Sequence, residues 1–276
     1  MLRIIQLKIL CLLHASGLSL QGGKRLFLLL LLSAREAAAK ALFRQANRAG
    51  KLLSLPASLM TFRARLRRMF GMVLLTIITA TSSAQDNSPV RILALGDSLT
   101  AGYGLVNGEG FTSQLQELLR SQGHNVEIIN GGVSGDTTAG GLARLDWALA
   151  DQPAAVILAL GANDGLRAID PQLTRANLTT LLEKLTAARL PVLLVGMLAP
   201  PNLGQQYEQA FNAIYPELAE QFEVLFYPFF LEGVAARPEL NQADGIHPNP
   251  QGVALIVQRM LPYVEQLLEQ VSAQTP

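Results

Sequence analysis

The sequence predicts an α/β fold in which helices cover both faces of a parallel, five-stranded sheet. From residue 89 onward, apolar segments of strand length alternate with amphipathic segments of helix length, the pattern of strands joined by right-handed crossovers. The segment AAVILAL at 154–160 is apolar throughout, as expected when a strand is covered on both sides. No internal repeat or low-complexity linker interrupts this part of the chain. We therefore expect one domain with a sizeable core.

The five expected strands are apolar runs that end close to glycine, proline or polar residues. They are VRILAL (90–95), NVEIIN (125–130), AAVILAL (154–160), PVLLVGM (191–197) and FEVLFYP (222–228). Helices are expected near 111–121, 138–150, 171–189, 206–221 and 250–270. Two of their ends carry clear signals. Asp170 and Pro171 suit an N-cap and a first helical position, and Gly123 follows a helix that ends near Gln122.

The amino-terminal part differs from the rest of the chain in charge. Residues 1–84 contain 13 Lys and Arg but 1 Asp or Glu, whereas residues 85–276 contain 9 and 20, a net charge of −11. Residues 60–84 are typical of a signal peptide, because four arginines precede a dozen apolar residues and the small-residue cleavage site SSA. We expect cleavage after Ala84 and a periplasmic or secreted product. An uncleaved membrane anchor is the alternative, although the apolar run is short of a full span.

Residues 1–59 form a basic, leucine-rich leader upstream of that signal peptide. We interpret it as a start codon assigned too early, with Met60 or Met69 as the first residue. The alternative is a membrane-associated basic helix. Residues 85–276 are expected to form the functional domain, without stable membrane insertion after processing and as a monomer.

Composition excludes several kinds of site from residues 85–276. The single cysteine, Cys11, lies in the leader, so neither a disulfide nor a thiolate zinc site is expected. His124 and His247 are the two histidines that remain, and we expect neither a metal nor a cofactor. A net negative charge argues against a nucleic-acid partner, because binding phosphates needs a basic surface.

Polar or glycine-rich sequence follows the first three expected strands and precedes the last helix. Because the carboxyl ends of parallel strands share one edge of the sheet, these segments are expected to converge. Ser98 follows the first strand, and a serine needs a neighbouring base, usually a histidine oriented by a carboxylate. His247 and Asp244 in DGIHP suit these roles, whereas His124 lies in a turn at the opposite end of a strand. The alternative is that Asp244 caps the loop and His247 only packs.

Acyl transfer also requires hydrogen-bond donors for the developing oxyanion. Ser98 and Gly135 can offer backbone N–H groups, and Asn163 can offer its side-chain amide. Taken singly, Gly135 and Asn163 are better explained as turn residues. The order in which they follow successive strands favours a shared site.

The segments GDSLTAGYG, SGDTTAGGLARL, GANDGLR and DGIHPNPQG resemble the four sequence blocks of the GDSL or SGNH hydrolase family. They are most similar to its bacterial periplasmic branch of arylesterases and multifunctional acyl-CoA thioesterase I/lysophospholipase L1 enzymes. The resemblance implies a three-layer α/β/α sandwich of flavodoxin-like order. It also implies Ser98 as nucleophile, Gly135 and Asn163 as oxyanion donors, His247 as base and Asp244 as its orienting partner.

The resemblance further implies a serine esterase that hydrolyses aryl esters, short- to medium-chain acyl esters, thioesters and lysophospholipids, without a cofactor. Its expected partner is a small-molecule or lipid-like ester. Two alternatives remain at this point: a carbohydrate O-deacetylase with the same residues, and a non-catalytic binding protein. The segments LRAIDP (166–171) and LAPPNLGQQY (198–207) suit the border of an acyl groove, with ordinary loop packing as the equal alternative.

Overall fold

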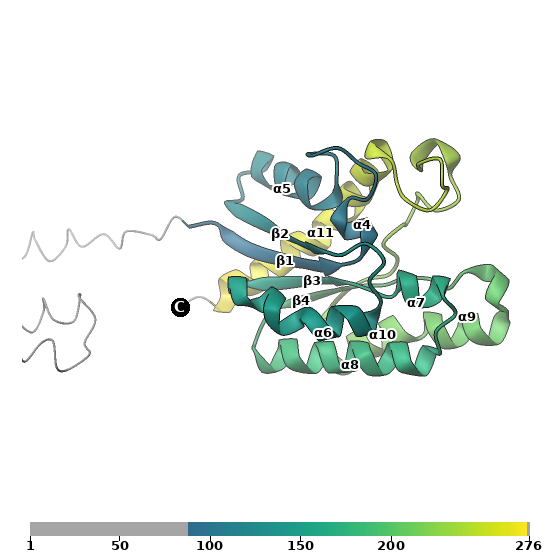
Figure 1. Ribbon diagram of the computed structural model, residues 1–276. Helices are drawn as coiled ribbons and strands as arrows, with labels where there is room; N and C mark the ends of the chain where they lie inside the picture. Colours follow the sequence, from purple (N-terminus) through teal and green to yellow (C-terminus); the bar gives the residue numbers. More distant parts are fainter. Residues whose placement is uncertain (1–87, 275–276) are drawn as a thin grey trace, which may run out of the picture. The chain divides into compact units, whose positions relative to one another are not determined.

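A computed structural model describes residues 88–274, and they form a five-stranded parallel sheet between two layers of helices (Figure 1). The strands are β1 (Val90–Gly96), β2 (Val126–Gly132), β3 (Ala155–Ala159), β4 (Val192–Val195) and β5 (Leu225–Tyr227). They lie in the order β2-β1-β3-β4-β5, which is the flavodoxin-like doubly wound arrangement. The predicted fold class is confirmed.

Helices on the two faces bury the apolar strands. One face carries α5 (Phe111–Ser121) and α11 (Pro250–Gln274), and the other carries α6 (Thr138–Ala148), α8 (Pro171–Ala187) and α10 (Ile214–Phe222) (Figure 1). Every residue of β3 is buried, as its apolar sequence predicts. The Asp170 carboxylate caps α8 by accepting the Gln172 N–H at 2.9 Å, and Pro171 is its first residue.

The carboxyl end of β2 extends two residues beyond the expected strand. Gly131 and Gly132 pair with Leu95 and Gly96 of β1. In the sequence, two consecutive glycines are more typical of a turn than of a strand. A Cβ atom on Gly132 would lie 2.3 Å from the backbone nitrogen of Ala101. The glycine therefore lets the short helix α4 (Ser98–Ala101) pack directly on the sheet edge.

The prediction of a single helix over 206–221 is wrong, because two helices occupy this segment. They are α9 (Gln205–Asn212) and α10, which begins at Ile214. Pro216 has no N–H to donate to the carbonyl of Asn212, so one hydrogen bond of a continuous helix is missing where α9 gives way to α10. β5 is shorter than expected because Phe222 belongs to α10.

The leader predicted at 1–59 and the signal peptide predicted at 60–84 lie outside the described residues. Within residues 88–274, no helix is both long enough and apolar enough to cross a membrane.

Candidate active site

Ser98 lies at the carboxyl end of β1, at the first position of α4. The preceding residue, Asp97, caps this helix: its Oδ1 accepts the Leu99 N–H at 3.0 Å. The Ser98 carbonyl accepts the backbone N–H groups of Gly102 and Tyr103, both at 3.1 Å. The turn that carries the serine is thus fixed by its own hydrogen bonds.

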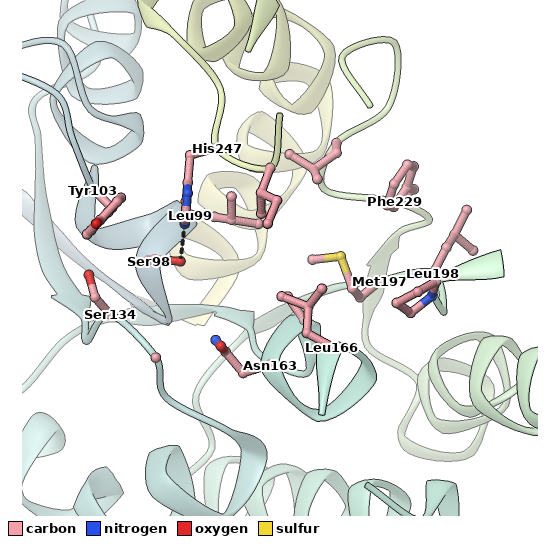
Figure 2. Close-up of a pocket in the computed structure, with 15 residues that line it drawn as sticks. Ser98, Leu99, Tyr103, Ser134, Asn163, Leu166, Met197, Leu198, Phe229 and His247 are labelled. Carbon is pink, nitrogen blue, oxygen red and sulfur yellow. Dashed lines mark hydrogen bonds between the residues drawn. The ribbon is translucent and has the colours of Figure 1, made fainter. Parts of the chain in front are cut away.

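His247 and Asp244 come from the loop before α11, and the imidazole of His247 lies against Ser98 (Figure 2). His247 Nε2 is 2.9 Å from the Ser98 hydroxyl oxygen, and His247 Nδ1 is 2.6 Å from Asp244 Oδ2. When Nδ1 carries the ring proton and donates a hydrogen bond to Asp244, Nε2 can accept the hydrogen bond of the Ser98 hydroxyl. The structure brings together a hydroxyl, an imidazole and a carboxylate in the order that nucleophilic catalysis requires.

Asp244 is held as a carboxylate by three hydrogen bonds from its own loop. Its Oδ1 accepts the N–H groups of Ile246 and His247 at 2.9 and 3.0 Å, and Oδ2 faces the imidazole. The hydrogen bonds from the His247 backbone and ring, followed by that from Ile246, lower the pKa of Asp244 to about 2. Asp244 therefore stays ionised and able to orient the imidazole at any pH near neutrality.

The structure places the other histidine away from this cluster. His124 lies in the turn between α5 and β2, where its N–H donates to the Leu119 carbonyl at 3.1 Å. This turn precedes the amino end of β2, whereas Ser98 follows the carboxyl end of β1, the parallel neighbour of β2.

Gly135 and Asn163 line the same pocket as Ser98 and His247. Gly135 has φ of +85° and its carbonyl accepts a hydrogen bond of 2.8 Å from the Arg167 guanidinium. Its own N–H has no partner in residues 88–274. Asn163 is the second residue of α7 (Ala162–Leu166), and its amide is directed toward the pocket (Figure 2). The two expected oxyanion donors therefore line one pocket with Ser98 and His247.

A buried network anchors the segment that carries Asn163. The neighbouring Asp164 is 1% exposed and accepts hydrogen bonds from the Thr138 N–H at 2.8 Å and the Thr138 hydroxyl at 2.5 Å. The Thr174 hydroxyl donates to the same carboxylate at 3.2 Å. These bonds tie α7 to the starts of α6 and α8, so Asn163 sits on a rigid support.

Asp97 has one carboxylate oxygen that the turn does not use. Oδ2 is buried and has no hydrogen-bond partner among the described residues, and the residue is 1% exposed. Burial raises the pKa of Asp97 to about 6, against the lowering effects of the Leu99 N–H and the nearby charge of His247.

Arg144 contacts both the end of β1 and the loop that carries Gly135. Its guanidinium lies 2.6 Å from the Asp136 carboxylate, next to Gly135, and donates at 2.8 Å to the Gly96 carbonyl at the end of β1. Both side chains of the ion pair are less than one-fifth exposed. Arg144 on α6 therefore links the end of β1, which precedes Ser98, to the loop that carries Gly135.

The pocket beside Ser98 has a volume of about 310 Å³ and a largely apolar wall (Figure 2). Its apolar side chains are those of Leu99, Leu166, Met197, Leu198, Pro200, Phe229, Leu231 and Ile246. Such a wall suits the hydrocarbon part of a substrate whose reacting carbonyl lies at Ser98. In residues 88–274, no group of three or more His, Cys, Asp or Glu side chains is placed to hold a metal ion.

Comparison with known proteins agrees with this geometry. The model of the GDSL-like lipase/acylhydrolase family matches residues 94–255. This chain belongs to the GDSL-like lipase/acylhydrolase family. It is 41% identical to an arylesterase from Vibrio mimicus over 186 residues, which are 67% of this chain and 90% of the relative.

Two further members of the GDSL-like family support the assignment. Thioesterase 1/protease 1/lysophospholipase L1 from Escherichia coli strain K12 is 37% identical over 211 residues, covering 76% of this chain and 98% of its own. The solved structure of AlinE4, an SGNH-hydrolase family esterase, is 48% identical with a TM-score of 0.56, covering 66% of this chain and 97% of that chain.

The sequence analysis identified some of the residues that line the pocket and missed others, and it also missed Arg144, which binds a backbone carbonyl group. Leu166, Leu198 and Pro200 belong to the segments that suit the border of an acyl groove, and all three line the pocket. Met197 and Phe229 were not expected there. Arg144 lies within the second block, SGDTTAGGLARL (134–145), but nothing in the sequence reveals which carbonyl it binds.

Proposed function

We propose that this protein is a serine esterase that hydrolyses carboxylic esters and thioesters through an acyl-enzyme on Ser98. The observation that carries the proposal is the continuous contact from Asp244 through His247 to Ser98, with distances of 2.6 and 2.9 Å, at the end of an apolar pocket. The names of the relatives in the GDSL-like family, an arylesterase and a thioesterase/lysophospholipase, support the same reaction class.

In the proposed cycle, His247 takes the Ser98 proton as the hydroxyl oxygen bonds to the substrate's carbonyl carbon. The tetrahedral oxyanion receives hydrogen bonds from the N–H groups of Ser98 and Gly135 and from the Asn163 amide. The carbonyl re-forms, the protonated imidazole gives its proton to the departing alcohol or thiol, and the acyl group remains on Ser98. Water then adds to the acyl-enzyme with His247 as base, and the acid leaves as Ser98 regains its proton.

The apolar wall favours substrates with an acyl chain or an aryl group over carbohydrates. A carbohydrate O-deacetylase would need several polar side chains to bind the sugar hydroxyl groups, whereas the pocket wall away from Ser98 is mostly aliphatic and includes two aromatic side chains, Tyr103 and Phe229. The one tryptophan of the chain, Trp147, is 78% exposed on α6 and does not line the pocket. We therefore propose aryl esters, acyl esters, acyl thioesters and lysophospholipids as the substrate class.

Labelling and turnover of Ser98 variants test the proposal. A fluorophosphonate should label the wild-type protein at Ser98, and Ser98→Ala should abolish both labelling and hydrolysis of phenyl acetate. Ser134→Ala is the matched control, because Ser134 lines the same pocket but has no contact with His247. Substantial turnover by folded Ser98→Ala would refute the assignment. A panel of phenyl acetate, longer acyl esters, palmitoyl-CoA and a lysophospholipid would rank the substrates.

We also propose that the protein is exported, processed after Ala84, and monomeric as residues 85–276. The support is the arginine-rich segment, apolar run and SSA sequence that precede Gln85. Mass spectrometry of the native amino terminus in periplasmic extracts tests this processing, and light scattering tests the monomer. An intact Met1 in the extracts would contradict the proposed start and cleavage.

A further inference from the structure

Ser98 and His247 are 149 positions apart, and they come from different loops. The Ser98 turn is fixed by β1 and α4, and Asp244 fixes His247 within its own loop. Neither set of contacts determines the distance between the two loops. A third residue must hold one against the other for His247 Nε2 to stay 2.9 Å from the hydroxyl.

Gln242 makes that connection. Its side-chain amide nitrogen donates to the Tyr103 carbonyl at 2.8 Å and to the Pro248 carbonyl at 2.9 Å. Tyr103 belongs to the serine side, because its N–H donates to the Ser98 carbonyl at 3.1 Å. Pro248 directly follows His247. One amide group therefore bridges the two halves of the site.

The backbone of Gln242 also closes the base loop. Its N–H donates to the His247 carbonyl at 2.7 Å, and its carbonyl accepts the Gly245 N–H at 2.9 Å. The amide oxygen of Gln242 packs closely against Gly104, in the segment that follows Ser98, because a Cβ atom on Gly104 would lie only 2.1 Å from Oε1. The side chain thus has contacts through both its nitrogen and its oxygen, and little freedom to move.

The other hydrogen bonds of the base loop tie its two ends to the segment before it: Asn241 pairs with Pro248, and the Asn249 N–H donates to the Leu240 carbonyl at 2.9 Å. Residues 243–246 are all exposed, and a second cavity of about 310 Å³ lies behind the loop. Its lining residues are Ala236, Arg237, Pro238, Asn241, Gln242, Ala243 and Gly245. Without the bridge, this space would allow the loop to relax away from the serine. Two contacts would remain near the site: the Tyr103 ring, whose centre is 4.6 Å from that of the imidazole, and the Gln114 side-chain amide, which donates to the Pro250 carbonyl at 3.1 Å.

We propose that Gln242 is a positioning residue that sets the Ser98–His247 distance by bridging the Tyr103 and Pro248 carbonyl groups. The inference rests on the proposed esterase function. Gln242 does not line the apolar pocket, so its loss should slow the attack of Ser98 without weakening substrate binding. The Asp244–His247 contact lies within the loop and should survive.

The test uses Gln242→Leu, which keeps the size of the side chain and removes both hydrogen bonds, and Gln242→Glu, which removes the donors. Misplacing a reacting group by about 1 Å can lower the rate about 100-fold. Each variant should therefore show fluorophosphonate labelling of Ser98 and a kcat for phenyl acetate about 10- to 100-fold lower, with KM unchanged. The downfield NMR signal of the His247 Nδ1 proton should be retained.

Gln116→Leu is the matched control. Gln116 Oε1 accepts the Ile128 N–H at 2.9 Å, a link between α5 and β2 that does not involve the site. This variant should lower thermal stability without changing the labelling rate.

Labelling of both Gln242 variants at the wild-type rate would overturn the inference while leaving the esterase proposal intact. An equal loss in Gln116→Leu, or failure of both Gln242 variants to fold, would also overturn it by making the effect one of general stability. Absence of Ser98 labelling in the wild-type protein would reject the proposed function itself, together with this inference.

Discussion

The buried carboxyl group of Asp97 should make the stability of the fold depend on pH. Burial raises its pKa from 3.8 to about 6, so the folded state binds this proton more tightly than the unfolded chain does. The resulting stabilisation is fully present below pH 3.8 and is lost as the pH rises through about 6. At about 1.4 kcal/mol for each tenfold change in proton affinity, the loss amounts to about 3 kcal/mol.

Asp97→Asn isolates this contribution. The asparagine carbonyl can still accept the Leu99 N–H, but the side chain no longer titrates. Urea denaturation of both proteins at intervals from pH 4 to 7.5 gives the free energy of unfolding at each pH. The difference, Asp97→Asn minus wild type, should increase by about 2.4 kcal/mol across this range, because part of the titration of the unfolded chain lies below pH 4. Any constant effect of the new amide group shifts the difference curve without changing its slope.

Asp146→Asn provides the control for this experiment. Its side chain is 81% exposed and pairs with Lys184 at the surface, so its difference curve should change by less than about 1 kcal/mol. If the Asp97→Asn and wild-type curves ran parallel from pH 4 to 7.5, the carboxyl group would not be desolvated as described. The link between its unused oxygen and its pKa would then be refuted.

Three further substitutions test other parts of the structure. Asp244→Asn should lower kcat on the order of 10³- to 10⁴-fold, because the amide no longer orients the imidazole; steady-state kinetics that retained a tenth of the activity would contradict this role. Met197→Trp should fill the apolar pocket and lower kcat/KM at least about tenfold more for long acyl esters than for phenyl acetate, and equal losses would count against an acyl site there. Arg144→Met should destabilise the fold by about 2 kcal/mol in urea denaturation, since it leaves the largely buried Asp136 carboxylate unpaired; a change below about 0.5 kcal/mol would show that the brace is dispensable.

The meeting of Ser98 with His247 could be predicted from the sequence because a parallel sheet restricts where strand ends lie. Once the apolar runs were interpreted as parallel strands, the polar segments after them had to share one edge of the sheet. Only two histidines follow residue 84, and one of them precedes a strand. Few alternatives therefore remained for the base.

Gln242 and Arg144 could not be predicted in the same way. Both bind backbone carbonyl groups, which every residue possesses, so no partner residue type marks the interaction in the sequence. The break between α9 and α10 is different, because Pro216 is visible in the sequence and cannot donate within a continuous helix. The amphipathic pattern on either side of Pro216 concealed this signal.

The distance of 149 positions between Ser98 and His247 has a consequence for biosynthesis. Chains emerge from the ribosome amino terminus first, so the serine is made long before the imidazole that would activate it. A chain that still lacks the loop before α11 has no His247 beside Ser98. Hydrolysis would begin only when the final loop docks, which keeps unfinished chains from acting on acyl groups around them.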